Sequence, residues 1–187
     1  MGQGKKLEGE GTRRGRTFRR EFLLFLILFF VIWFVSYLLT RRLPGLVMGL
    51  QAFVAREVAF CLKLLGYRLT LNGARIFYYP GHGSGTITII AECTGLYTTI
   101  IYFSIIGAYP ARIGEKLTGL LIGVPSIHLL NLVRMVFISL VLYHRKDLFH
   151  FFHGYLWQVS FVIFMLLLVI LWMGKIVKRE QTPDRLT

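Results

Sequence analysis

Cys93 is the side chain of this sequence best placed to act as a nucleophile. It lies in the segment Glu92-Cys93-Thr94-Gly95, where an alternating, strand-like pattern gives way to an apolar run typical of a helix. A thiol at a helix N-terminus experiences the positive end of the helix dipole, which favours the reactive thiolate. Most free cysteines are instead small buried apolar residues, so position alone leaves both interpretations of Cys93 open. Cys61, in a partly polar helical stretch, fits the structural interpretation better.

Arg134 is the second chemically notable residue because it lies inside an apolar segment. It is nine residues from the outer end of that segment, hence about 14 Å deep at the rise of an α-helix. An arginine there costs at least about 2.5–3.5 kcal/mol on insertion scales, and it stays charged because a guanidinium does not release its proton at physiological pH. The predicted membrane segments contain no Asp or Glu, which favours a functional role over an internal salt bridge. Asn131, one turn earlier, is placed to orient the guanidinium, and His128 continues the polar stripe.

Three histidines lie at or near the outer loop before the last apolar segment: His144, His150 and His153. An imidazole titrates near neutral pH and can act as general acid or base beside a thiol. Metal sites usually recruit Cys, Asp or Glu ligands as well, and only Asp147 is nearby, so we expect no metal site here.

A thiol, a guanidinium and an imidazole together are suited to acyl transfer. If Cys93, Arg134 and His153 meet at one membrane face, the histidine would help to maintain the thiolate, which attacks a peptide carbonyl. The arginine would stabilise the oxyanion or hold the substrate. The glycine-rich segment 81–85 has neither the G-x-S-x-G register of a serine hydrolase nor the lysine of a phosphate loop.

The elements that must position these residues are membrane helices. Of 187 residues, 55% are hydrophobic and 17% are charged, and the mean hydropathy is +0.61. This composition excludes a disordered chain, and two cysteines are too few for a disulfide scaffold. Eleven of the 22 lysines and arginines lie before the first apolar segment or after the last. The net charge of +13 therefore indicates membrane flanks rather than nucleic-acid binding.

Four apolar segments are predicted to cross the membrane, with both basic tails in the cytoplasm. The first segment carries no charge over 18 positions, and as a helix it would nearly cross a hydrocarbon core of about 30 Å. Basic residues favour the cytoplasmic side, and two cytoplasmic tails require an even number of crossings. The predicted spans are residues 22–39, 95–109, 117–143 and 155–173, within one membrane domain (22–174) between the tails 1–21 and 175–187.

Residues 44–66 are apolar enough to suggest a fifth span, but Arg56, Glu57 and Lys63 interrupt the pattern. A fifth crossing would also place one basic tail outside. We therefore predict an amphipathic helix at the outer interface, or a re-entrant helix.

Residues 67–92 alternate with period two and contain Asn72-Gly73, which is typical of a hairpin with a type I′ turn. The predicted fold class is thus an all-α polytopic membrane protein. It has about four transmembrane helices, an interfacial amphipathic or re-entrant helix and a small strand-rich outer hairpin.

The order and spacing of these residues resemble the exosortase/archaeosortase family of membrane transpeptidases. That family has a C-[ST]-G motif after a strand-like outer segment, an N-x-x-R motif inside a span and a histidine that opens the final span. The matching residues here are Cys93-Thr94-Gly95, Asn131-Leu-Val-Arg134 and His153. The resemblance covers roughly residues 66–170, and the segment 151–158 is most similar to the short exosortase H type.

The histidine of the family pattern has two candidates in this chain. The family's histidine is often followed four residues later by glycine, which fits His150 and Gly154. His153 leads directly into the apolar helix, with Phe161 eight positions later, and is the preferred candidate. His150 is the alternative.

The resemblance implies a cysteine-dependent peptidase or transpeptidase that requires no metal or organic cofactor. Cys93 would be the nucleophile, Arg134 the stabilising cation, and Thr94, Gly95 and Asn131 supporting or substrate-binding residues. The implied partners are exported proteins whose C-terminus carries a short motif, a transmembrane helix and a basic cluster. Cleavage through a Cys93 thioester would transfer or release them to the cell surface, onto a glycan or lipid acceptor. The implied location is the cytoplasmic (inner) membrane, with the active site on the outer, periplasmic face.

Two other classes of function stay open at the level of sequence. In a non-enzymatic scaffold or assembly factor of an export system, Arg134 would dock an acidic partner and Cys93 would be a packing residue. In a small ion or solute pathway, His128, Asn131 and Arg134 would line the route. Indifference to Cys93 substitution would favour either alternative over the enzyme.

Overall fold

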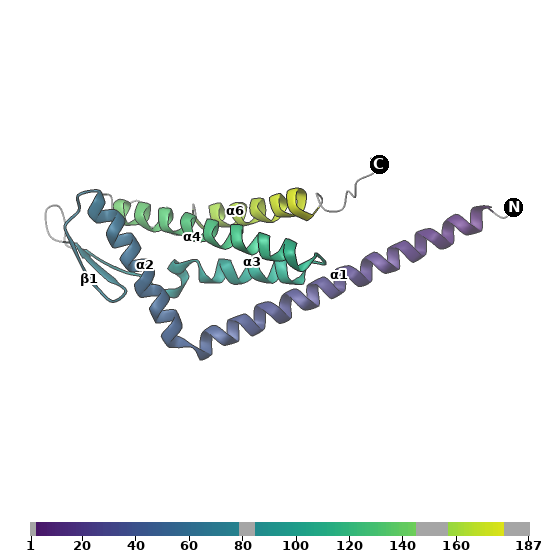
Figure 1. Cartoon of the computed structure of the whole chain (residues 1–187), viewed down its shortest axis with the longest axis horizontal. Helices are drawn as coiled ribbons and strands as arrows, with labels where there is room; N and C mark the ends of the chain where they lie inside the picture. The colour runs from purple at the N-terminus through teal and green to yellow at the C-terminus, as the bar shows by residue number, and fades with distance from the viewer. Residues whose placement is uncertain (1–2, 79–84, 145–156, 178–187) are drawn as a thin grey trace.

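The computed structural model describes residues 3–78, 85–144 and 157–177 of the chain (Figure 1). Two helices come first, α1 (Gln3–Arg42) and α2 (Pro44–Leu64), separated by Leu43. Proline fits the first position of a helix but disfavours helical backbone at the residue before it. Leu43 accordingly adopts φ −119° and ψ 61°, and the chain changes direction there.

Three further helices run alongside one another as a bundle (Figure 1). They are α3 (Leu96–Ala108), α4 (Ile113–His144) and α6 (Trp157–Leu171), the last continuing into the π-helical turn η4 (Trp172–Val177). α1 packs against α3, and Gly107 permits the approach because a Cβ there would lie 3.1 Å from Cδ1 of Ile32. α2 is steeply inclined to α3 and α4 and contacts α4.

A small antiparallel sheet lies at the end of the molecule where α2 ends (Figure 1). Its strands are β1 (Leu69–Asn72), β2 (Arg75–Tyr78) and β3 (Thr86–Thr88), in that spatial order. The predicted hairpin is therefore present, but its two-residue loop is Gly73-Ala74, because Asn72 pairs with Arg75. Gly73 has φ +58° and Ala74 does not have positive φ, so the predicted type I′ turn, which needs both, is wrong.

An aromatic cluster fastens this sheet to the end of α4. The ring of Tyr143 lies 5.0 Å from that of Tyr67 and 5.5 Å from that of Tyr78. The Tyr67 hydroxyl is hydrogen-bonded to Nε2 of His144 at 2.7 Å. His144 is therefore a structural residue at the sheet.

The helices bear out the predicted all-α membrane fold. Three are long and apolar enough to cross a bilayer, namely Arg19–Arg42, Pro44–Leu64 and Ile113–His144. Two shorter apolar helices, Leu96–Ala108 and Val159–Gly174, complete the set among the described residues. α2 is thus long and apolar enough to be a span. It is steeply inclined to the bundle, as a helix would be that crosses the membrane obliquely or lies partly in the interface.

Candidate active site

Cys93 lies in a short 3₁₀ turn, η1 (Ala91–Thr94), between the sheet and α3. The Thr94 hydroxyl donates to the Ala91 carbonyl at 2.7 Å, and the Cys93 N–H donates to the Ile90 carbonyl at 2.9 Å. Gly95 then adopts the left-handed conformation, with φ +76°, and α3 starts at Leu96. Glycine is the residue that adopts this conformation at little cost, which explains its place after Cys93-Thr94.

The environment of the Cys93 thiol differs from the one predicted. Its side chain is buried, with 5% of the residue exposed, and it precedes α3 rather than lying in its first turn. Burial raises the pKa of the Cys93 thiol above its ordinary value. A hydrogen bond with the Ile90 backbone and the positive charge of Arg134 lower this pKa, but by less, and the negative charge of Glu92 raises it further. The effect of burial is thus the largest, so Cys93 holds its proton at neutral pH and needs a base.

Asn131 connects the bundle to the turn that carries Cys93. It is fully buried on α4, and its Nδ2 donates to the Cys93 carbonyl at 2.9 Å. A Cβ at Gly95 would lie 3.4 Å from the Asn131 side chain, so the absence of a side chain at Gly95 also leaves room for Asn131. The Asn131 Oδ1 atom has no hydrogen-bond partner among the described residues. Asn131 therefore holds the turn in place and keeps one buried acceptor free.

Arg134 lies three residues after Asn131 on the same helix, partly buried and close enough to interact electrostatically with Cys93. Its guanidinium carbon is 5.3 Å from the centre of the Phe161 ring on α6, a cation–π contact. Its Nε is buried and has no hydrogen-bond partner in the described part of the chain. The Phe161 ring thus partly stabilises the positive charge of Arg134, for which the predicted spans contain no carboxylate. The Nε–H of Arg134 remains available as a hydrogen-bond donor.

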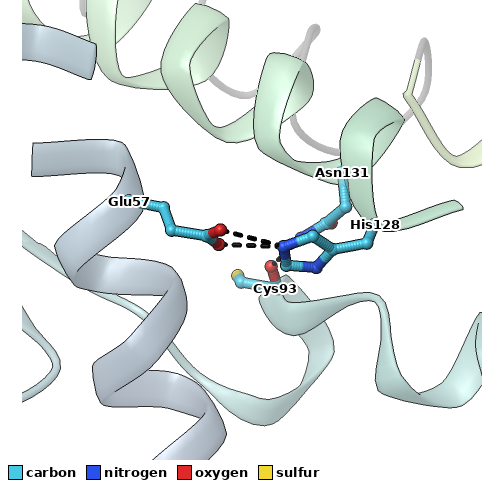
Figure 2. Close-up of polar contacts among 4 residues, drawn as sticks. All are labelled: Glu57, Cys93, His128 and Asn131. Atoms are coloured by element: carbon cyan, nitrogen blue, oxygen red, sulfur yellow. Dashed lines mark hydrogen bonds and ion pairs between the residues drawn. The ribbon is translucent and has the colours of Figure 1, made fainter. Parts of the chain in front are cut away.

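A pair of residues that the sequence prediction did not connect lies beside this turn. Figure 2 shows the Glu57 carboxylate of α2 meeting the His128 imidazole of α4, with the sulfur of Cys93 pointing toward the α2 side. His128 Nε2 lies 2.9 Å from Oε2 and 3.2 Å from Oε1 of Glu57. The two side chains are 33% and 27% exposed, and the ring of Phe53 stacks on the imidazole at 5.9 Å.

Glu57 escaped notice because it appeared as one of several charges on an interfacial helix, and its partner is 71 residues away in the sequence. A signal was nevertheless present. An acidic residue in an otherwise apolar helix needs a partner, and His128 is a polar residue in a predicted span that could supply one.

His153 and His150 lie outside the described residues, so the structure does not place the predicted general base. Cys93, Thr94, Gly95, Asn131 and Arg134 are all described and lie together. In the described part of the chain, no group of three His, Cys, Asp or Glu side chains is arranged to hold a metal ion.

Fold and site together define a class: polytopic helical membrane proteins with a buried thiol at a sheet–helix junction, held by an asparagine and facing an arginine of the next long helix. Comparison with known sequences gives the family. The chain belongs to the transmembrane exosortase family, whose model matches residues 11–173. This confirms the resemblance seen in the motifs and extends it into the first helix, where the sequence showed no signature.

One curated relative is Archaeosortase A of Haloferax volcanii. It is 33% identical over 105 residues, which make up 53% of this chain and 34% of the relative. The chain therefore spans about a third of the length of the curated relative that it matches. No solved structure matches the chain.

Proposed function

We propose that this protein is a membrane-embedded cysteine peptidase or transpeptidase that cleaves the C-terminal sorting signal of exported proteins. One observation carries the proposal: Asn131 and Arg134, on one face of α4, both act on Cys93, the first through its carbonyl and the second through its charge. Family membership supports the same chemistry. A scaffold would need no such convergence on one cysteine residue.

In the proposed reaction the Cys93 sulfur attacks the carbonyl carbon of the scissile peptide. The S–H bond breaks, an S–C bond forms, and the negative charge moves onto the carbonyl oxygen. The free Nε donor and charge of Arg134 suit it to stabilise this oxyanion. When the C–N bond breaks, the leaving amine takes up a proton and Cys93 remains as a thioester.

A second nucleophile then attacks the thioester and releases the body of the substrate. With water the reaction is hydrolysis, and with an amine or hydroxyl of a surface glycan or lipid it is transfer. His153, with His150 as the alternative, is proposed to supply general acid–base catalysis, and Thr94 and Gly95 shape the turn beneath the substrate.

We also propose that the site faces outward from the cytoplasmic membrane. The start of α1 and the end of η4 lie at the same end of the molecule, opposite the sheet and η1 (Figure 1). The basic residues of the first and last segments favour the cytoplasmic side. The sheet and Cys93 would then lie at the periplasmic face, where an exported substrate presents the outer end of its transmembrane helix.

The test is processing of a tagged exported protein that carries a short motif, an apolar helix and a basic tail. Cys93→Ala should abolish the mobility shift with insertion unchanged, a loss of at least about 10³-fold, because the variant has no thiol at the site to form the thioester. Cys61→Ala is the matched control and should process normally, since Cys61 has no place in the mechanism. Normal processing by Cys93→Ala would overturn the proposal and favour the scaffold.

A further inference from the structure

The Glu57–His128 pair has no role in the reaction as described so far. Both residues belong to helices that are long and apolar enough to span a membrane. Ionisable groups in such helices are costly, and they mark functional sites unless a structural need explains them. Each side chain is about one-third exposed, so the pair opens toward solvent or substrate rather than sealing a core.

Packing around Cys93 places this pair beside the turn that carries the thiol. Val54 and Val58, which flank Glu57 along α2, belong to the same buried cluster as Cys93. Asn131, one turn after His128 on α4, binds the Cys93 carbonyl. The pair therefore closes the side of the site formed by α2, η1 and α4, as Figure 2 shows.

The contact with Glu57 determines which nitrogen of His128 can accept a proton. An ionised carboxylate only accepts hydrogen bonds, so Nε2, which faces Glu57, carries the hydrogen. In the neutral imidazole the lone pair is then on Nδ1. A carboxylate behind the ring also stabilises the imidazolium that forms when Nδ1 takes up a proton, as in catalytic triads.

We propose that His128, oriented by Glu57, is a second acid–base residue of the site and serves the acylation step at Cys93. The inference rests on the proposed cysteine mechanism. In the proposed step the Cys93 side chain turns from the α2 side toward His128 as the S–C bond forms. The thiol proton moves to Nδ1 of His128 and passes to the leaving nitrogen when the C–N bond breaks. Glu57 keeps accepting the hydrogen bond from Nε2 throughout, and His153 serves the attack of the second nucleophile.

The other charged groups around the thiol cannot take this part. Arg134 of α4 is a permanent cation that lowers the pKa of Cys93, and Glu92 of η1 is an exposed carboxylate that raises it. From α2 the uncharged ring of Phe53 stacks on His128, and from α6 the uncharged ring of Phe161 meets Arg134. Because burial keeps Cys93 protonated, the step needs a nearby base.

The experiment compares the pH dependence of substrate processing in wild type, His128→Gln and Glu57→Gln, each in the full-length protein in membranes. His128→Gln should lose about 10²–10³-fold near pH 7 and recover most of that loss near pH 9.5, because hydroxide can then deprotonate the thiol. Glu57→Gln should lose less, about tenfold, since its carbonyl still orients the ring but no longer stabilises the imidazolium. Added imidazole should restore part of the activity of His128→Ala.

The matched control is His144→Gln, on the same helix, whose imidazole bonds to Tyr67 instead of a carboxylate; it should keep the wild-type profile. A loss by the same factor at every pH, without rescue by imidazole, would overturn the inference in favour of a structural pair. Wild-type pH profiles in both His128→Gln and Glu57→Gln, with Cys93→Ala inactive, would also overturn the inference. That outcome would leave the proposed function intact. If the His128 variants fail to insert, the pH profile of the nearly isosteric Glu57→Gln decides. A loss that varies with pH supports the inference, and a loss by the same factor at every pH overturns it.

Discussion

At the scale of single residues, the site depends on a competition between burial and charge at Cys93. The turn places the thiol out of water, which opposes ionisation, and Arg134 offsets only part of that effect. A buried, protonated thiol is protected from oxidants and becomes a nucleophile only when a base and a substrate are present. The hydrogen bond from Asn131 and the left-handed Gly95 keep the thiol in the position where this can happen.

The first prediction concerns the ionisation of Cys93. In a Cys61→Ser background, the rate of alkylation of Cys93 should rise with pH only above the ordinary titration range of a thiol, because burial raises its pKa. Arg134→Gln should move the profile further toward high pH, since it removes a charge that lowers this pKa. Alkylation with iodoacetamide across a pH series measures both. A profile that shifts toward low pH in Arg134→Gln would contradict the electrostatic role.

The second prediction concerns the backbone after Cys93. Gly95→Ala should lower the stability of the protein by about 1–2 kcal/mol, because an L-residue with a side chain is strained at φ +76°. The new methyl group would also press on Asn131 at 3.4 Å and disturb its bond to Cys93, so processing should fall together with the melting temperature. Gly114→Ala is the control: a Cβ there meets nothing within 4 Å, and its melting temperature should not fall.

At the scale of elements, α4 organises the site and its neighbours hold its side chains in place. One face of this helix carries His128, Asn131 and Arg134 at intervals of three residues, so that each meets a different element. His128 meets α2, Asn131 meets η1, and Arg134 meets α6. Close packing of the same helix against η4 and α3 follows from Gly119 and Gly123, where a Cβ would collide with Trp172 and Tyr102.

The third prediction tests the contact between α4 and α6. Phe161→Leu should impair processing because it removes the ring that supports the Arg134 guanidinium at 5.3 Å, a contact worth about 0.5–2 kcal/mol. Phe161→Trp should retain more activity than Phe161→Leu, since it keeps an aromatic face. Phe103→Leu, at an exposed position of α3, is the control for loss of an aromatic residue. Equal activity of the leucine and tryptophan variants would show that the ring only fills space.

At the scale of the whole molecule, the chain separates a polar end from an apolar body. The sheet, η1 and the end of α4 gather at one end, whereas α1 presents a large apolar surface that no other described element covers, as expected for contact with lipid. The inclined α2 contacts η1, the sheet and α4, so it bounds the site laterally. A substrate helix in the membrane would reach Cys93 from this end.

The fourth prediction tests the orientation of the protein. In a Cys61→Ser, Cys93→Ala background, Thr70→Cys on β1 should react with an impermeant maleimide added to intact spheroplasts, because we place the sheet outside. Arg20→Cys on α1 should react only after the membrane is permeabilised. Both positions are exposed, so access depends on the side of the membrane alone. The opposite labelling pattern would place the site in the cytoplasm.

The sequence by itself determined the membrane class, the helical segments, the hairpin and the family. It also singled out Cys93, Asn131 and Arg134, whose catalytic roles remain predictions. Each of these depends on composition, on periodicity or on motifs within a short stretch of chain, which are local properties. The predicted domain limits and the choice of His153 over His150 remain predictions.

Only the tertiary structure decided how these residues act on one another. The turn loop shifted by one residue because strand pairing, rather than the Asn72-Gly73 preference, set the register. The thiol became harder to ionise because packing by α2 and α4 desolvates it, an effect that no local motif reports. The pairing of Glu57 with His128 and of Arg134 with Phe161 joins residues far apart in the chain, and such contacts exist only once the helices have packed.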